Sequence, residues 1–178
     1  MDEAIKDYDK NIRFIDLDEN SGHAHARNIA LEEVETPYFM FLDADDELAS
    51  YAITFYLEKF NNTDGLIAPI HSFTTQRPQF VDLDRVRVEY FNAKENINSF
   101  LRKQSACNII FRTAIVRAHH IRFNENLNTY VDWSFVLEYM KYVNKFVRIF
   151  NFPFYFRGEV YVPFETLTLS EQNFDILF

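Results

Sequence analysis

The chain has 178 residues, of which 48% are hydrophobic and 25% charged, a composition that suits one folded domain and excludes disorder. Its formal charge of -9 argues against nucleic acid as a partner, because an acidic surface repels phosphate. Three glycines are too few for a glycine-rich phosphate loop. The single cysteine, Cys107, indicates a reducing compartment, so we expect a cytoplasmic protein, with a peripheral position at the inner face of the membrane as a variant of that expectation.

Strands and helices are expected to alternate along the first seventy residues. A short strand is predicted at 12–17, a helix at 23–34, and a buried strand at 38–42, where five apolar residues follow one another. A second helix is predicted at 48–60 and a third strand at 65–70. This alternation is the signature of an α/β layer architecture.

The rest of the chain has a weaker pattern, without repeats or linkers. Residues 80–91 predict an edge strand or a surface hairpin, and residues 94–103 a helix. A short strand is expected at 107–111, a helix at 132–143, and one or two strands at 146–157. We therefore treat the whole chain, 1–178, as a single unit.

Four carboxylates, Asp43, Asp45, Asp46 and Glu47, follow the buried strand at 38–42. Ligands of open α/β sheets bind beyond the carboxyl ends of strands, and a divalent cation with oxygen ligands relieves the repulsion between such close charges. The alternative is that these acids only occupy the first turn of the next helix, where negative charge suits the helix dipole.

Two blocks around this cluster carry a resemblance. Asn-Ser-Gly-His-Ala-His-Ala-Arg-Asn at 20–28 and Thr-Pro-Tyr-Phe-Met-Phe-Leu-Asp-Ala-Asp-Asp at 36–46 resemble the central region of the inverting glycosyltransferases of family 2. The resemblance implies a partial GT-A fold, that is, α/β with a mixed, mainly parallel sheet flanked by helices. It also implies that Asp43 and Asp45 hold Mn²⁺ or Mg²⁺, which neutralises the diphosphate of a nucleotide-sugar donor.

The same resemblance assigns further residues to the donor. Arg27 matches the family arginine near the donor nucleotide, Gly22 allows the backbone to approach it, and Arg157 resembles a later arginine near the diphosphate. For Arg27 the alternative is a solvated charge on the helix surface.

A catalytic base is expected from a later part of the chain. The stretch at 120–135 resembles the family's base region, which places Asp132 in the position of the base. Inverting transfer needs one such group to deprotonate the acceptor hydroxyl. The family's neighbouring glutamate falls on Val131, and Asp132 alternatively acts only as a cap of the following helix. We expect Asp43 and Asp45 to converge in space with Asp132.

The chain resembles a transferase domain that lacks its N-terminal nucleotide-binding strands. An uncovered apolar sheet edge would follow, so we expect self-association or a rearranged edge, weak donor binding and no activity of the isolated chain. The closest resemblance is to bacterial transferases of teichoic acid or other cell-surface polymers, which implies a glycan or polyol-phosphate acceptor and a possible fused transferase module. The alternative is a non-catalytic scaffold or interaction module of a larger teichoic acid glycerophosphotransferase.

Overall fold

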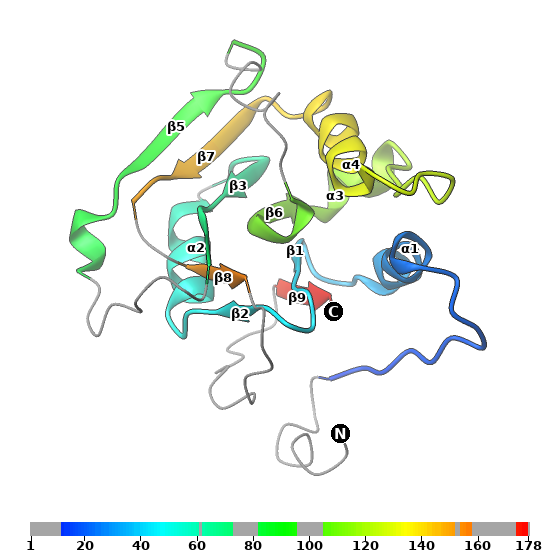
Figure 1. Cartoon of the computed structure of the whole chain (residues 1–178). Helices are drawn as coiled ribbons and strands as arrows, with labels where there is room; N and C mark the ends of the chain where they lie inside the picture. The colour runs from blue at the N-terminus through cyan, green and yellow to red at the C-terminus, as the bar shows by residue number, and fades with distance from the viewer. Residues whose placement is uncertain are drawn as a thin grey trace.

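The computed structural model describes residues 12–60, 62–72, 82–95, 105–151, 154–157 and 174–177, which form a large and a small sheet flanked by helices (Figure 1). Within these ranges no helix has the length and apolar character that crossing a bilayer requires. In chain order the elements are α1 (His23–Glu33), β1 (Tyr38–Phe41), β2 (Glu47–Leu48), α2 (Ala52–Phe60), β3 (Gly65–Ile67), β4 (Ile70–Ser72), η1 (Leu83–Arg85), β5 (Val88–Asn92), η3 (Ala106–Asn108), β6 (Ile109–Arg112), α3 (Thr113–Ala118), α4 (Val131–Met140), β7 (Lys145–Ile149), β8 (Tyr155–Arg157) and β9 (Phe174–Leu177).

The large sheet has the strand order β5-β7-β3-β6-β1-β9 and is mixed, as expected for this fold. The expected predominance of parallel pairing is not found among the described strands. The pairs β3–β7 and β1–β9 are parallel, whereas β5–β7, β3–β6 and β1–β6 are antiparallel. The reason is β6, which lies between β3 and β1 and runs opposite to both, and which comes from the part of the chain where strand and helix do not alternate.

A smaller sheet with the order β2-β8-β4 changes two expected elements. The strand predicted at 65–70 is divided between the two sheets, because Pro69 follows β3 and has no N–H group for a ladder hydrogen bond. The first turn of the helix predicted at 48–60 is replaced by β2, in which Leu48 pairs with Tyr155 of β8. The helix α2 therefore begins only at Ala52.

The outer edge of β1 explains a third difference. Residues 12–17 do not form the predicted strand, and their large side chains are exposed, with Phe14 at 63%. The edge of β1 is instead paired in parallel by β9, from Tyr38 opposite Phe174 to Phe41 opposite Leu177. Among the described strands this edge is therefore covered within the chain by β9, and self-association stays a prediction.

The remaining elements agree more closely with the sequence pattern. The helices α1 and α4 and the strands β1, β6, β7 and β8 lie within one to three residues of the predicted ends at most of their termini. β5 is an edge strand of the large sheet, as one of the two expectations for 80–91 required. The helix predicted at 94–103 falls mostly outside the described residues. The short helix α3 and the strand β9 were not expected.

Aromatic side chains fill the core beneath the end of β1. Phe41 packs edge-on against Phe111 and Phe135, with ring centroids 6.0 Å apart in each case. Phe123 stacks on Phe135 at 4.1 Å, and all four rings are buried. Edge-to-face and offset-stacked pairs are the favourable arrangements for such rings. This packing fixes the β1 strand against α4 and so determines where the residues that follow each of them lie.

Candidate functional site

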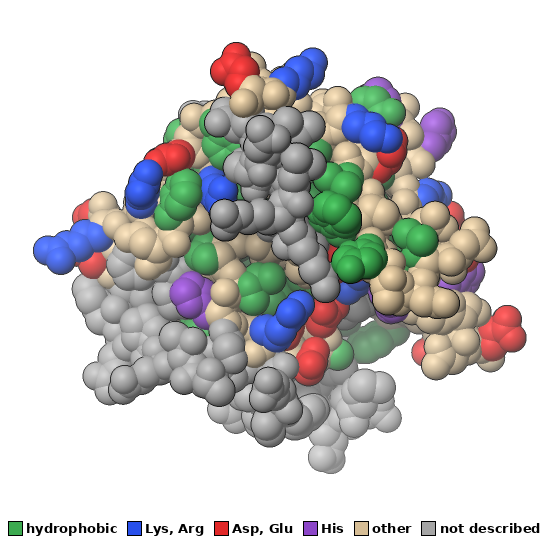
Figure 2. Space-filling model, turned by 45° about the horizontal axis from the view of Figure 1, so that its top comes forward, with side chains coloured by type: hydrophobic (Ala, Val, Ile, Leu, Met, Phe, Trp, Pro, Cys, Tyr) green, Lys and Arg blue, Asp and Glu red, His purple; other side chains and the backbone are tan. Residues whose placement is uncertain are grey.

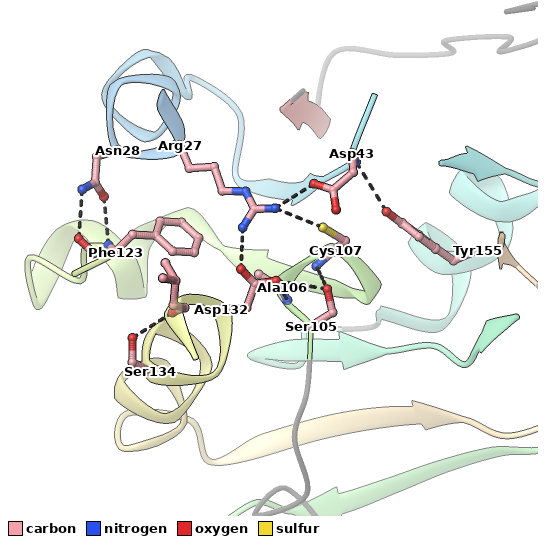
Figure 3. A network of polar contacts seen from close by, with 11 residues as sticks. Arg27, Asn28, Asp43, Ser105, Ala106, Cys107, Phe123, Asp132, Ser134 and Tyr155 are labelled. Atoms are coloured by element: carbon pink, nitrogen blue, oxygen red, sulfur yellow. Dashed lines mark hydrogen bonds and ion pairs between the residues drawn. The ribbon is translucent and has the colours of Figure 1, made fainter. Parts of the chain in front are cut away.

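Arg27 is the centre of a charged cluster between α1 and α4. Its Nη1 donates to Asp132 Oδ1 at 2.5 Å and its Nη2 to Asp43 Oδ1 at 2.7 Å, as Figure 3 shows. The Arg27 side chain is only 13% exposed, so it is not the solvated helix charge of the alternative interpretation. One guanidinium therefore joins two carboxylates that are far apart in the sequence.

The two carboxylates reach Arg27 from different elements. Asp43 follows the end of β1, and Asp132 lies in the first turn of α4. The expected convergence of Asp43 with Asp132 is present, since both carboxylates bind the same side chain. Asp45 lies two residues beyond Asp43 in the same turn, and its side chain is exposed.

Asp132 is oriented by the segment before β6. Its Oδ2 accepts hydrogen bonds from the Ser105 hydroxyl and from the Ala106 N–H, both at 3.1 Å. Ser105 in turn caps η3 by accepting from the Cys107 N–H at 3.2 Å. Within the described contacts, the side chain of Asp132 does not accept an N–H of its own helix α4, and the N-cap position of α4 belongs to Tyr130. The pure capping role is therefore not the one that the described contacts give to Asp132.

Two aromatic rings lie beside the buried guanidinium of Arg27. It lies 5.5 Å from the ring centroid of Phe41 and 5.4 Å from that of Phe123, distances at which a cation is attracted to a ring face. Burial by itself lowers the pKa of Arg27, but the charges around it, foremost Asp132, outweigh that effect and raise the pKa overall. The guanidinium is thus a fixed positive charge between two carboxylates.

Asn28 holds α1 against the loop that leads into α4. Its amide donates to the Phe123 carbonyl at 3.0 Å, and its carbonyl oxygen accepts from the Phe123 N–H at 2.8 Å. The amide also donates to Glu125, whose carboxylate accepts a hydrogen bond from the His25 ring at 3.1 Å. Because the Asn28 side chain is buried, these bonds fix the distance between Arg27 and the start of α4.

The acidic turn between β1 and β2 has two bound aspartates, Asp43 and Asp46, and one open aspartate, Asp45. Tyr155 donates its hydroxyl proton to Asp46 and accepts from the Asp43 N–H at 3.4 Å. Burial, with the charges of this turn, raises the pKa of Tyr155, so its hydroxyl stays protonated. Asp45 has no hydrogen bond or ion pair within the described ranges.

A divalent cation fits this turn only if a bound substrate supplies further oxygen atoms to coordinate it. Among the described residues, no group of three or more His, Cys, Asp and Glu side chains is arranged to hold a metal ion. Asp43 and Asp45 supply two carboxylates, and the Asp43 side chain is 39% exposed although Oδ1 binds Arg27. Magnesium-type ions take one or two protein carboxylates together with phosphate oxygens of a substrate, and the donor set here meets that requirement.

An open pocket of about 390 Å³ adjoins Asp132. Arg157, at the end of β8, lines it, and its exposed side chain has no ion pair or hydrogen bond within the part of the chain that the structure describes. Gly22 immediately precedes the pocket residue His23 and has a φ of +83°, a conformation that favours glycine. A Cβ on Gly22 would meet nothing within 4 Å, so the backbone there is open to a ligand. On the face drawn in Figure 2, acidic, basic and hydrophobic side chains lie close together near the middle of the view.

Three residues of the site were not predicted. Ser105 orients Asp132, Cys107 lies 3.6 Å from Arg27, and Tyr155 holds the acidic turn. The serine and the cysteine precede a short apolar strand in the sequence, and the tyrosine lies within one, so no local pattern marks them. Their partners are brought to them by the sheet.

Comparison with known proteins identifies relatives of this chain. Residues 1–124 match the family model "Glycosyl transferase family 2". All 178 residues are 99% identical to part of the "Teichoic acid poly(glycerol phosphate) polymerase" of Staphylococcus epidermidis, and the chain spans 25% of that relative.

Solved structures of S. aureus TarS share the fold. The structure of residues 1–349 in complex with UDP-GlcNAc has a TM-score of 0.72 at 18% identity, covering 94% of this chain and 48% of that TarS chain. The structure of residues 1–349 in complex with UDP has a TM-score of 0.64 at 20% identity, covering 79% of this chain and 41% of that TarS chain.

Proposed function

The chain belongs to glycosyl transferase family 2, and from that premise we propose that it transfers a sugar, with inversion, from a nucleotide-sugar donor to an acceptor hydroxyl. The observation that carries the proposal is the junction of Asp43 and Asp132 on one guanidinium. Inverting displacement needs a leaving-group site and a base on opposite faces of the anomeric carbon, and the two carboxylates joined by Arg27 support these two roles.

Asp132 and Asp43 are proposed to have different tasks in the reaction, Asp132 on the side of the acceptor and Asp43 on the side of the leaving group. The acceptor oxygen attacks the anomeric carbon while Asp132 takes the hydroxyl proton, and the bond from that carbon to the diphosphate oxygen breaks. Ser105 and the Ala106 N–H keep the Asp132 carboxylate oriented, and the acceptor hydroxyl would replace Arg27 at Oδ1. Such positioned proton transfer contributes about 10²- to 10⁴-fold in rate.

The donor is assigned to the acidic turn. Asp43 and Asp45 would hold Mn²⁺ or Mg²⁺, which when bound neutralises negative charge on the leaving diphosphate. Arg27 and Arg157 are proposed to contact the donor phosphates as positively charged donors, and Gly22 to leave space for the donor at the start of α1. The exposure of Asp45, the open backbone at Gly22 and the pocket position of Arg157 support these roles.

The biological setting comes from the relatives. Because of the 99% identity to part of a teichoic acid polymerase, we propose that the acceptor belongs to teichoic acid or another cell-surface polysaccharide. We propose UDP-GlcNAc as a donor to test, since a structure with the same fold was solved with it. A cytoplasmic setting is supported by the single, buried thiol of Cys107.

A second function is a non-catalytic module within a larger glycerophosphotransferase. It is favoured by the name of the relative, which refers to glycerol phosphate rather than to a sugar, and by the quarter of that relative that the chain spans. Val131, which is apolar and buried where the family has a glutamate, also favours it.

Metal-dependent donor binding and sugar transfer distinguish the two functions. Calorimetry with UDP-GlcNAc and MnCl₂ measures the first, and release of UDP in the presence of teichoic acid measures the second. Both are measured on the full-length relative, of which this chain spans 25%, because the isolated chain is expected to bind the donor weakly and to be inactive. We expect Asp45→Asn to weaken Mn²⁺-dependent binding, and Asp132→Asn to leave binding unchanged but reduce transfer at least a hundredfold. Asp84→Asn, an exposed acid in η1, is the matched control. Equal behaviour of all three variants and the parent would support the non-catalytic module.

A further inference from the structure

Tyr130 has a backbone conformation that is unusual for a large side chain. Its φ of 60° and ψ of 22° lie in the left-handed region, and it stands at the N-cap of α4. The Tyr130 carbonyl accepts the first helical hydrogen bond, from the Ser134 N–H at 2.9 Å. Bulky residues rarely adopt positive φ, and such conformations are concentrated at functional sites.

This conformation is accompanied by an outward-facing ring beside the candidate base. The Tyr130 side chain is 59% exposed and lies 5.9 Å from the ring of Trp133, and both line the pocket that contains Asp132. Phe14 and Tyr90 are the other strongly exposed aromatic residues in the described ranges, and neither lines this pocket. An exposed tyrosine ring and a half-buried tryptophan ring thus lie together in the pocket that contains Asp132.

We propose that Tyr130 and Trp133 form a platform that stacks against a sugar ring of the acceptor and presents its hydroxyl to Asp132. The proposal rests on the proposed function, in which Asp132 deprotonates that hydroxyl. The apolar C–H face of a pyranose complements an aromatic face, whereas a linear polyol phosphate has no ring to stack. The side chains of Asn128, Thr129 and Ser105 on the same pocket wall can meet the polar hydroxyl rim of a sugar.

The single tryptophan of the chain makes the platform directly observable. Trp133 is the only tryptophan, so tryptophan fluorescence, excited selectively over the ten tyrosines, reports on this pocket. We expect chitotriose, used as a soluble glycan probe, to change the fluorescence of the full 178-residue chain in a saturable way. Asn tolerates the left-handed region, so Tyr130→Asn keeps the backbone while removing the ring, and we expect about tenfold weaker binding.

Two further variants separate the ring from general effects. Tyr130→Phe retains the ring and should bind chitotriose like the parent. Tyr90→Ala removes a tyrosine of similar exposure, 54%, from β5 and should also bind like the parent. Equal affinity of Tyr130→Asn and the parent would overturn the platform, as would a parent chain that does not respond to chitotriose.

Two measurements keep this proposal apart from the proposed function. Fluorescence that responds to oligo(glycerol phosphate) but not to chitotriose would replace the sugar ring by a polyol phosphate and overturn the platform. Failure of UDP-GlcNAc and Mn²⁺ to bind the full-length relative in calorimetry would count against the proposed donor site. A chitotriose response that depends on Tyr130 would still support the platform in that case.

Discussion

Removing the Arg27 guanidinium tests the charged cluster most directly. Arg27→Met keeps an unbranched stem that can pack on Phe41 and Phe123, but it leaves Asp43 and Asp132 facing each other without their cation. We expect the folded state to lose stability for this reason, and a divalent cation to recover part of it.

The expected magnitude follows from the exposure of the three side chains. Breaking a fully buried ion pair costs about 3–5 kcal/mol, because a charge remains without a partner. Here Arg27 is 13% exposed, Asp132 26% and Asp43 39%, so water can partly solvate the carboxylates that remain. We therefore expect a loss of about 2 kcal/mol, which corresponds to a Tm lowered by about 4–8 °C for a chain of this length.

Calorimetric unfolding with EDTA and with MnCl₂ measures both effects. In Arg27→Met, Mn²⁺ no longer competes with the guanidinium for Asp43, so Mn²⁺ at about ten times its Kd should restore about 1.4 kcal/mol. The control is Arg13→Met, an arginine 52% exposed, whose surface ion pair with Glu33 should contribute less than about 1 kcal/mol. Equal Tm values for the two variants, or an Arg27→Met variant insensitive to Mn²⁺, would refute the reasoning.

Two further predictions concern buried residues, one in the large sheet and one beside Arg27. Gly65→Ala places a Cβ 2.3 Å from the ring of Phe146, which is fully buried and cannot move aside, so we expect a loss of about 1–3 kcal/mol, seen as a lower urea midpoint with an unchanged m-value. An alanine variant as stable as the parent would contradict this packing. Burial, followed by Asp43, raises the pKa of the Cys107 thiol from its ordinary 9.0 to about 12. The unfolded chain therefore loses this proton first, and between pH 9 and pH 12 the parent should lose stability more steeply than Cys107→Ala; parallel pH profiles of Tm would exclude the effect.

The local sequence pattern was sufficient to predict the helices and strands whose formation depends mainly on residues close to them in the sequence. The apolar run before Asp43 predicts β1, and the acids that follow mark its end. The alanine and valine spacing predicts α1 and so puts Arg27 on a helix, and the pattern that begins beside Asp132 predicts α4. In each case the residues that make up the pattern lie within one strand or within one or two helical turns.

The strands β2 and β9, which the sequence pattern did not predict, form because a neighbouring strand pairs with each of them. Leu48 fits a helix start as well as a strand, and it becomes part of β2 because Tyr155 of β8 is beside it. β9 forms because the edge of β1 offers unpaired backbone groups, and the same occupancy leaves Phe14 outside the sheet. No local propensity contains this information.

The sequence by itself determined which residue types are available for chemistry and on which elements they stand: Arg27 in a helix, Asp43 after a buried strand, and Asp132 at the start of another helix. Only the tertiary structure decided that one guanidinium joins both carboxylates, across 16 and 105 positions of the chain, and that Ser105 orients the second. The physical reason is that hydrogen bonds and ion pairs act over about 3 Å, so their partners are fixed by how sheets and helices pack rather than by distance along the chain.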